Sequence, residues 1–244
     1  MATVRLELEY DGGGFRGWAK QPGLRTVQGE LEGALATVLR KQVELTVAGR
    51  TDTGVHARGQ VASFVTEAEV PGDLARRLNG VGPNDITVTS ATAAADDFDA
   101  RHDAKSRTYR YRVLVRPSPS PFEEGRALWW PHELDRDSLD ACAASLIGTH
   151  DFTAFTPTKT DHVRFERDVL AATWTSDGDI LNFQITADAF MRNMVRVLVG
   201  TMLETASGRR SVPNFKALLK GAPRSSAGDT APPHGLYLQS VSYD

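Results

Sequence analysis

Seven segments of the chain alternate apolar and polar residues, which is the pattern of strands that bury one face. They are residues 4–10, 43–47, 61–65, 86–88, 109–115, 180–187 and 236–241. Several of these segments are too close together in sequence to leave room for the crossover helices that parallel strands require. The pattern therefore predicts a mixed sheet that is largely antiparallel.

Apolar residues spaced three or four apart predict three longer helices. The first helix has Thr26 as N-cap and carries Val27, Leu31, Leu35, Val38 and Leu39. The second carries Leu139, Cys142, Leu146 and Ile147 and ends at Gly148. The third runs from Phe190 through Met194 and Met202 to Ser207-Gly208. Shorter helices are expected after Pro71 and Pro213. Together with the strands, these helices predict an α+β fold in which helices flank the sheet.

Composition excludes several classes of protein. Of the 244 residues, 41% are hydrophobic and 24% are charged, which is typical of a folded globular chain and not of a disordered or fibrous one. The longest apolar run contains Arg196 and is shorter than the roughly 18 residues of a membrane helix. The chain starts directly with a predicted strand, so no signal peptide is expected. Because Cys142 is the single cysteine, an internal disulfide and a structural zinc site are excluded, and the expected compartment is the reducing cytoplasm.

Charge is distributed unevenly. The formal net charge of −3 argues against non-specific affinity for nucleic acid. Residues 101–116, however, contain Arg101, Lys105, Arg107, Arg110, Arg112 and Arg116 against a single acidic residue, Asp103. Such a local patch can bind RNA. The alternative is a set of solvated charges on an exposed strand face, which suits Arg110 and Arg112 equally well.

Several familiar cofactor motifs are excluded. Residues 12–17 satisfy GxGxxG, but a dinucleotide site needs a helix that opens directly on those glycines. Here Pro22-Gly23 intervenes and helical spacing begins only at Thr26. The chain has no GxxxxGK[ST] phosphate loop, and its six histidines show no paired-ligand spacing, so no metal site is predicted.

The segment from Gly49 to Gly59 lies between two predicted strands and contains one carboxylate, Asp52, among two arginines and a histidine. A carboxyl group beside an arginine has a pKa below the usual value of about 3.9, so it is ionised at neutral pH. It is then a weak base and no acid, but a competent nucleophile or charge stabiliser. The alternative is that Asp52 only forms an Asx-turn ahead of Gly54.

Residues 49–57, Gly-Arg-Thr-Asp-Thr-Gly-Val-His-Ala, resemble the signature of the TruA family of tRNA pseudouridine synthases. The resemblance spans nearly the whole chain, through residues 10–12, 26–32, 98–101, 109–111, 150–155, 194–196, 231–232 and 235–238 together with Phe15, Gly17, Trp18, Phe190 and Gly200. One departure is Thr53, where the family usually has alanine. Threonine adds bulk and a hydroxyl group but removes no functional group.

The resemblance implies the pseudouridine synthase fold, with two related subdomains at residues 1–104 and 105–244 and Asp52 in the cleft between them. It implies an isomerase that converts uridine to pseudouridine in the anticodon stem-loop of tRNA, at tRNA positions 38–40. The N1–C1′ bond breaks, the uracil turns and a C5–C1′ bond forms. Substrate and product contain the same atoms, so no cofactor is required. The resemblance also implies a homodimer that contacts tRNA with both subunits.

On the same resemblance, Asp52 is the nucleophile, and its attack on the ribose or on the uracil ring stays open. Arg196 is expected to pair with Asp52, because an arginine among apolar residues needs a partner. Tyr109 is expected to stack on the uracil. Without the resemblance, Tyr109 is better explained as a core tyrosine, because aromatic residues on one strand face usually pack together.

A base in a stem must leave the stack before a side chain can reach it. Arg50 or Arg58 is expected to fill the vacated position with its guanidinium plane. Arg101 and Arg107 are expected to contact phosphates.

Two other functions compete with this interpretation. A glycoside hydrolase also uses a carboxylate at an anomeric carbon, but it needs a second acidic residue, which the segment around Asp52 does not offer. A non-catalytic RNA-binding module of the same fold would bind through residues 101–116 and would not need Asp52.

Overall fold

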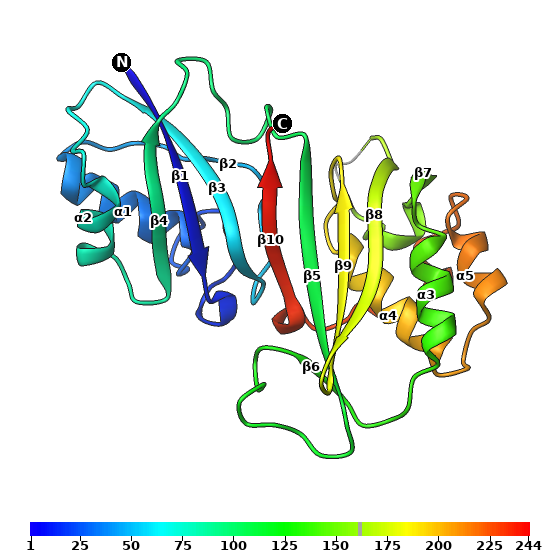
Figure 1. Cartoon of the computed structure of the whole chain (residues 1–244). Coiled ribbons are helices and arrows are strands. Elements are labelled where there is room, and N and C mark those ends of the chain that lie inside the picture. Colours follow the sequence, from blue (N-terminus) through cyan, green and yellow to red (C-terminus); the bar gives the residue numbers. More distant parts are fainter. Residues whose placement is uncertain (161–162) are drawn as a thin grey trace. The chain divides into compact units, whose positions relative to one another are not determined.

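The computed structural model describes residues 1–160 and 163–244 (Figure 1). His162, one of the six histidines, lies outside them. The chain forms two compact units. The first comprises Met1–Lys105 and Tyr237–Asp244, and the second comprises Ser106–Leu236. The predicted relationship between subdomains 1–104 and 105–244 stays a prediction.

The first unit contains a sheet with the strand order β4-β1-β3-β10. The short strand β2 pairs with β3 at Ala62 and Ser63. The strands are β1 (Ala2–Tyr10), β2 (Thr46–Val47), β3 (His56–Thr66), β4 (Ile86–Ala93) and β10 (Leu236–Ser242). β1 runs antiparallel to both β3 and β4. β10 pairs in parallel with β3 through Tyr237 and Leu238, which is why the last residues of the chain belong to this unit. Helices α1 (Val27–Leu39) and α2 (Leu74–Val81) lie on one face of the sheet (Figure 1).

The core of the first unit follows from alternation along β1. Val4, Leu6 and Leu8 are buried, whereas the residues between them are partly exposed. The start of α1 is as predicted: the Thr26 side chain accepts a hydrogen bond from the Gly29 N–H and satisfies one of the unpaired donors of the first turn.

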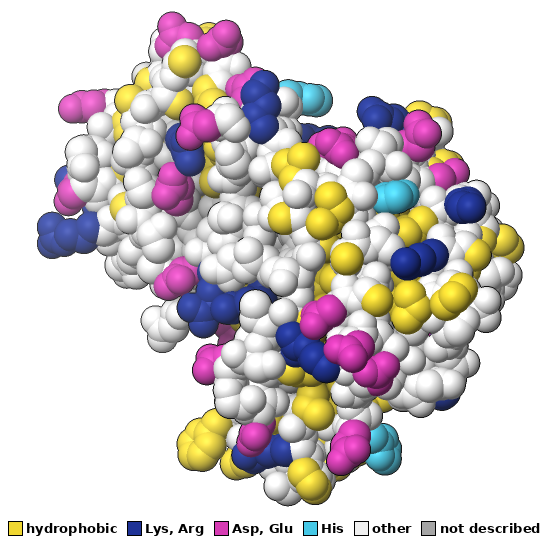
Figure 2. Space-filling model, turned by 45° about the vertical axis from the view of Figure 1, so that its right-hand side comes forward, with side chains coloured by type: hydrophobic (Ala, Val, Ile, Leu, Met, Phe, Trp, Pro, Cys, Tyr) yellow, Lys and Arg dark blue, Asp and Glu magenta, His cyan; other side chains and the backbone are white. Residues whose placement is uncertain are grey.

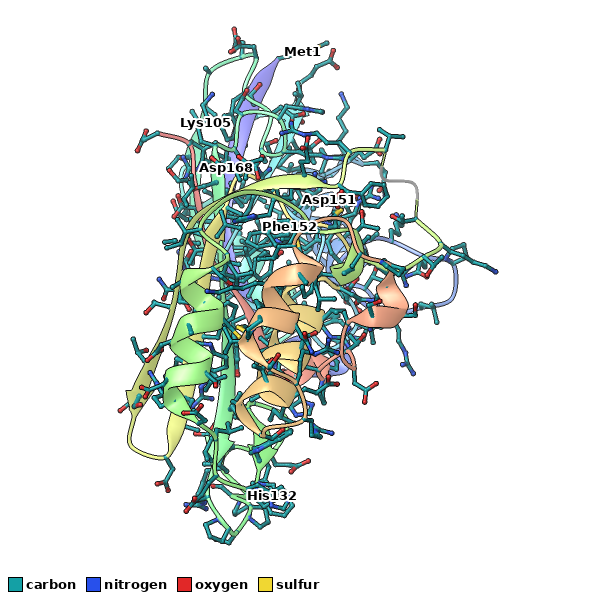
Figure 3. All side chains as sticks on the ribbon, turned by 90° about the vertical axis from the view of Figure 1, so that its right-hand side faces the viewer. Met1, Lys105, His132, Asp151, Phe152 and Asp168 are labelled. Carbon is teal, nitrogen blue, oxygen red and sulfur yellow. The ribbon has the colours of Figure 1, made fainter. Side chains whose placement is uncertain are left out.

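The second unit is a sheet with the order β5-β9-β8-β7, and β6 pairs with β5. The strands are β5 (Ser106–Val115), β6 (Leu128–Trp130), β7 (Gly148–Asp151), β8 (Glu166–Asp177) and β9 (Ile180–Ala187). Helices α3 (Arg136–Ala144), α4 (Met194–Ala206) and α5 (Val212–Leu218) stand side by side against the strands of this unit (Figure 3). The pairs β5–β9, β9–β8 and β8–β7 are antiparallel, whereas β6 pairs in parallel with β5. The predicted α+β class with a largely antiparallel mixed sheet is confirmed.

Some element boundaries were predicted wrongly. The second helix ends at Ala144, so Ile147 lies outside it and is exposed. The third helix begins at Met194 and not at Phe190, because Asn193 has a φ of 61° and interrupts helical geometry before it. β2 is limited to Thr46–Val47. Among the described residues, no helix is long and apolar enough to cross a membrane.

Candidate active site

Asp52 lies on the loop of residues 48–55 that joins β2 to β3 in the first unit, as predicted. The Val55 N–H donates a hydrogen bond of 3.1 Å to the Asp52 carbonyl oxygen and closes a tight turn. Gly54 occupies the third position of this turn with a φ of 78°, a conformation that favours glycine. Asp52 is half-buried, and Thr53, the residue that departs from the family pattern, is exposed. The extra methyl and hydroxyl groups of Thr53 therefore face solvent.

The turn is closed by the backbone and not by the Asp52 side chain. Within the first unit, every residue of which the structure describes, no hydrogen bond reaches the Asp52 carboxylate. An Asx-turn would require that carboxylate to accept a backbone N–H. The Asx-turn explanation of Asp52 is therefore wrong, and the carboxylate has no structural task in its own unit.

The residues after β1 pack closely on this loop. A side chain at Gly12 would collide with the Val55 carbonyl oxygen, and one at Gly17 would lie 3.0 Å from the Thr51 carbonyl oxygen. Trp18 donates its backbone N–H to that same Thr51 oxygen at 3.0 Å. Two glycines of the GxGxxG motif, Gly12 and Gly17, thus permit close packing on the loop. Gly12–Gly14 form a short 3-10 turn, and α1 begins only at Val27.

His56 joins three segments at the other end of the loop. Its Nδ1 accepts the Gly12 N–H at 3.0 Å, and its buried ring stacks on Tyr237 of β10 with the ring centres 4.6 Å apart. An Asp11 carboxylate oxygen lies 3.2 Å from the same Nδ1. The sequence alone assigned His56 no role, and the structure gives it a structural one.

Arg50 and Arg58 are both exposed, and both belong to the same unit as Asp52. Arg50 precedes Asp52 by two residues on the loop, and Arg58 lies near the start of β3. Their charged groups are accessible to solvent, as an RNA-binding role would require.

Tyr109 lies on β5 in the second unit and is 8% exposed. Its ring meets the edge of Phe190 at 5.0 Å between ring centres. It shares a buried strand face with Tyr111 and Val113. These contacts are what the core-tyrosine alternative predicts, and the role of Tyr109 at the uracil stays a prediction.

Arg196 lies in the first turn of α4 and is half-buried. Its Nε donates to the Ala231 carbonyl oxygen at 2.7 Å, and its Nη1 donates to Asn193 Oδ1 at 3.0 Å. Burial raises the pKa of the neighbouring Tyr111 hydroxyl, and the positive charge of Arg196 opposes that rise. The guanidinium therefore binds oxygen atoms of uncharged groups in its own unit. Asp52 belongs to the first unit, and its pairing with Arg196 stays a prediction.

Residues 229–235, which include Ala231, the hydrogen-bond partner of Arg196, pack closely against α4 and β5. A side chain at Gly200 would collide with the Asp229 carbonyl oxygen, and one at Gly235 would lie 2.7 Å from the Tyr111 ring. The Tyr111 hydroxyl donates to the Pro232 carbonyl oxygen at 2.8 Å. These contacts explain why glycine stands at both positions.

The basic run of residues 101–116 divides into two kinds of side chain. Arg101 is exposed, and Arg107 is half-buried and donates to the Asp188 carbonyl oxygen at 2.9 Å. Arg112 forms an ion pair of 2.7 Å with Glu123. Arg116 donates to two backbone carbonyl oxygens of the loop between β5 and β6. Two of the six charges thus stabilise that loop. Figure 2 shows Lys and Arg side chains interspersed with Asp and Glu on the face that it draws.

Comparison with known proteins identifies the family. A family model described as tRNA pseudouridine synthase matches residues 8–103 and 142–244. The chain is 41% identical over 244 residues to tRNA pseudouridine synthase A of Bacillus subtilis (strain 168), and 40% identical over 244 residues to that of Bacillus pumilus (strain SAFR-032), with 99% of each chain covered in both cases. It is 37% identical to tRNA pseudouridine synthase A of Acetivibrio thermocellus, with all of both chains covered.

A crystal structure of a Cbf5-Nop10-Gar1 complex covers 82% of this chain and 54% of its own, at 11% identity and a TM-score of 0.35. The family assignment rests on the family model and on the full-length relatives. The chain belongs to the tRNA pseudouridine synthases, isomerases that convert uridine to pseudouridine in tRNA.

Proposed function

We propose that Asp52 is the nucleophile of this reaction and that the uridines lie in the anticodon stem-loop, at tRNA positions 38–40. The observation that carries the proposal is the half-buried Asp52 carboxylate, which accepts no hydrogen bond from its own, fully described unit. It lies on a tight turn inside the nine-residue segment that resembles the family signature. A carboxylate without a structural task, on a rigid loop, is suited to react with a ligand.

The chemistry is a balanced isomerisation. The ionised carboxylate of Asp52 attacks either the ribose C1′ or the uracil ring, and the N1–C1′ bond breaks. The uracil turns, C5 bonds to C1′, and the bond to Asp52 breaks so that the carboxylate is regenerated. The proton on C5 is released while N1 gains one. No electron is lost or gained overall, so Asp52 needs no redox partner.

The other proposed residues act around that step. Arg50 or Arg58, both exposed, fills the space that the extruded base leaves in the stem. Tyr109 stacks on the uracil, and Arg196 pairs with the Asp52 carboxylate.

Binding of tRNA is proposed to include phosphate contacts from Arg101 and Arg107. Arg101 is the stronger candidate because its side chain is exposed, whereas that of Arg107 is half-buried.

We also propose that the protein acts as a homodimer in the cytoplasm. The resemblance to the family supports the dimer. The single cysteine, Cys142, which is buried as a free thiol, supports a reducing compartment.

An anticodon stem-loop carrying tritium at C5 of the uridines at positions 38–40 tests the proposal. Incubation with the protein should release tritium to water, because C5 exchanges its hydrogen for the bond to C1′. Loss of the base without tritium release would indicate a hydrolase, and binding without either would indicate an RNA-binding module. A stem-loop labelled only at uridines outside these positions is the control, and release from it at the same rate would contradict the proposed site.

A further inference from the structure

We propose that three buried side chains, Tyr10, Thr51 and Gln60, form a positioning device that sets the orientation of Asp52. Here they are called the Tyr10 network. The inference rests on the proposed role of Asp52 as the nucleophile. It adds residues that touch no substrate and act through the backbone of the loop.

The three side chains are among the most deeply buried polar groups of the first unit. Gln60 is 0% exposed, Tyr10 5% and Thr51 6%. Gln60 Nε2 donates to the Gly49 carbonyl oxygen at 2.7 Å and to the Tyr10 hydroxyl oxygen at 3.2 Å. The Tyr10 hydroxyl and Thr51 Oγ1 are 2.8 Å apart. Two strands, β1 and β3, thus hold the loop at residues 49 and 51.

The Gln60 amide anchors the network. Both of its amide hydrogens are used, and its Oε1 accepts the Val61 N–H at 3.2 Å. The Tyr10 oxygen receives one of these hydrogens and shares a second hydrogen bond with Thr51 Oγ1, in which either hydroxyl group can be the donor. Burial raises the pKa of Tyr10 to about 12, which keeps its hydroxyl proton in place at neutral pH. A buried hydrogen-bonded network rigidifies its surroundings.

The network acts on Asp52 through Thr51. The side chain of Thr51 is held by Tyr10, and its carbonyl oxygen is held by the Trp18 N–H at 3.0 Å. Of its two neighbours in the chain, Arg50 is exposed and Asp52 is half-buried. Fixing a buried residue at both its side chain and its backbone sets the directions in which the residues on either side point. These neighbours are one of the two candidate stacking arginines and the proposed nucleophile.

A purely structural network would behave differently from a positioning one. Loss of a hydrogen bond that only stabilises the fold lowers the melting temperature and leaves the rate at low temperature unchanged. Loss of positioning lowers kcat while the KM for tRNA stays constant, because a displaced nucleophile weakens the reaction step and not the binding of RNA.

The test compares Tyr10→Phe, Thr51→Val and Thr51→Ser with the wild type well below their melting temperatures. Tyr10→Phe and Thr51→Val should each lower kcat by about 10- to 100-fold with KM changed by less than about twofold. Thr51→Ser, which keeps the hydroxyl group, should restore most of that loss. The double variant Tyr10→Phe with Thr51→Val should lose no more than the worse single variant, because both remove the same hydrogen bond.

The matched control is Tyr243→Phe in the same unit. The Tyr243 hydroxyl donates to the Ala100 carbonyl oxygen at 2.7 Å and makes no contact with the loop of Asp52 through that bond. Its loss should lower the melting temperature and leave kcat unchanged. An equal fall in kcat for Tyr243→Phe would overturn the inference, as would double-variant losses that multiply.

Asp52→Asn is measured in parallel so that two kinds of failure are separated. If Asp52→Asn is inactive while Tyr10→Phe and Thr51→Val keep wild-type kcat, the positioning role is wrong and the nucleophile stands. If Asp52→Asn stays active, the proposed function itself is wrong and the positioning role falls with it. If Tyr10→Phe does not fold, the comparison of Thr51→Val with Thr51→Ser decides the inference, because only the first removes the hydroxyl group.

Discussion

Asp52 differs from other carboxylates of its unit in what surrounds it. Asp85 is held by two hydrogen bonds from the Arg25 guanidinium, of 2.7 and 2.8 Å, and this pairing lowers the pKa of Asp85. Asp73 accepts one hydrogen bond of 2.6 Å from Arg77 Nε, which lowers its pKa. Those carboxylates have structural partners, whereas Asp52 has none within the fully described first unit. At the residue scale, this contrast is the argument for a chemical role.

Tyr109→Phe tests the second residue of the proposed site. The substitution keeps the ring that packs on Phe190 and removes only the hydroxyl group. If Tyr109 acts at the uracil, tRNA affinity should persist while turnover falls by about tenfold or more. A lower melting temperature with affinity and turnover both unchanged at low temperature would instead support the core-tyrosine alternative.

The sequence could single out Asp52 because the evidence for it is local: one carboxylate among arginines in a short segment that resembles a known signature. The surroundings of Arg196 could not be predicted in this way. Its hydrogen-bond partners include the carbonyl oxygen of Ala231, 35 positions away in sequence. The Tyr10 network was missed for the same reason, since Tyr10 and Thr51 are 41 positions apart.

At the scale of elements, the alternation of apolar and polar residues did not predict β8, and a local irregularity explains why. β8 is twelve residues long, but the register of its pairing with β9 shifts between Val169 and Ala171. A shift of this kind moves side chains from one face to the other and breaks the alternation on which the sequence analysis depends. β9 alternates cleanly and pairs with β5 without a register shift. Its predicted ends, Ile180–Ala187, are the observed ones.

Two helix glycines should respond in opposite ways to alanine. Gly33 in α1 has open space where a side chain would lie, so Gly33→Ala should stabilise the protein by about 0.5–1 kcal/mol through helix propensity. In α4, a side chain at Gly200 would collide with the Asp229 carbonyl oxygen. Gly200→Ala should therefore destabilise the protein by about 1–3 kcal/mol.

Urea unfolding of both variants measures these changes. The two substitutions are chemically identical and both lie inside helices, so each is the control of the other. Equal effects of the same sign would show that the Asp229 segment does not pack on α4 as described.

At the scale of the whole molecule, a chain with net charge −3 has to bind a polyanion. The basic side chains of residues 101–116 differ in exposure. Arg116 is half-buried and bonded to the carbonyl oxygens of Ser118 and Pro119, whereas Arg101 is exposed. We therefore expect the affinity for tRNA to depend on a subset of the basic run and not on its total charge.

Salt dependence of tRNA binding tests this division. Each neutralised phosphate contributes about −0.7 to −0.9 to the slope of log K against log salt concentration. Arg101→Ala should make the slope less steep by about one unit, and Arg116→Ala should leave it unchanged. An unchanged slope for Arg101→Ala would remove that residue from the RNA path.

The most direct test of the whole account is the single-turnover rate of Asp52→Asn on the tritiated anticodon stem-loop. Asparagine is close to aspartate in shape, so the melting temperature and the affinity for RNA should match those of the wild type. Because the amide is not a nucleophile, tritium release should fall by about a thousandfold or more. A variant that folds, binds RNA and keeps more than about a tenth of the wild-type rate would contradict the assignment of Asp52 as the nucleophile.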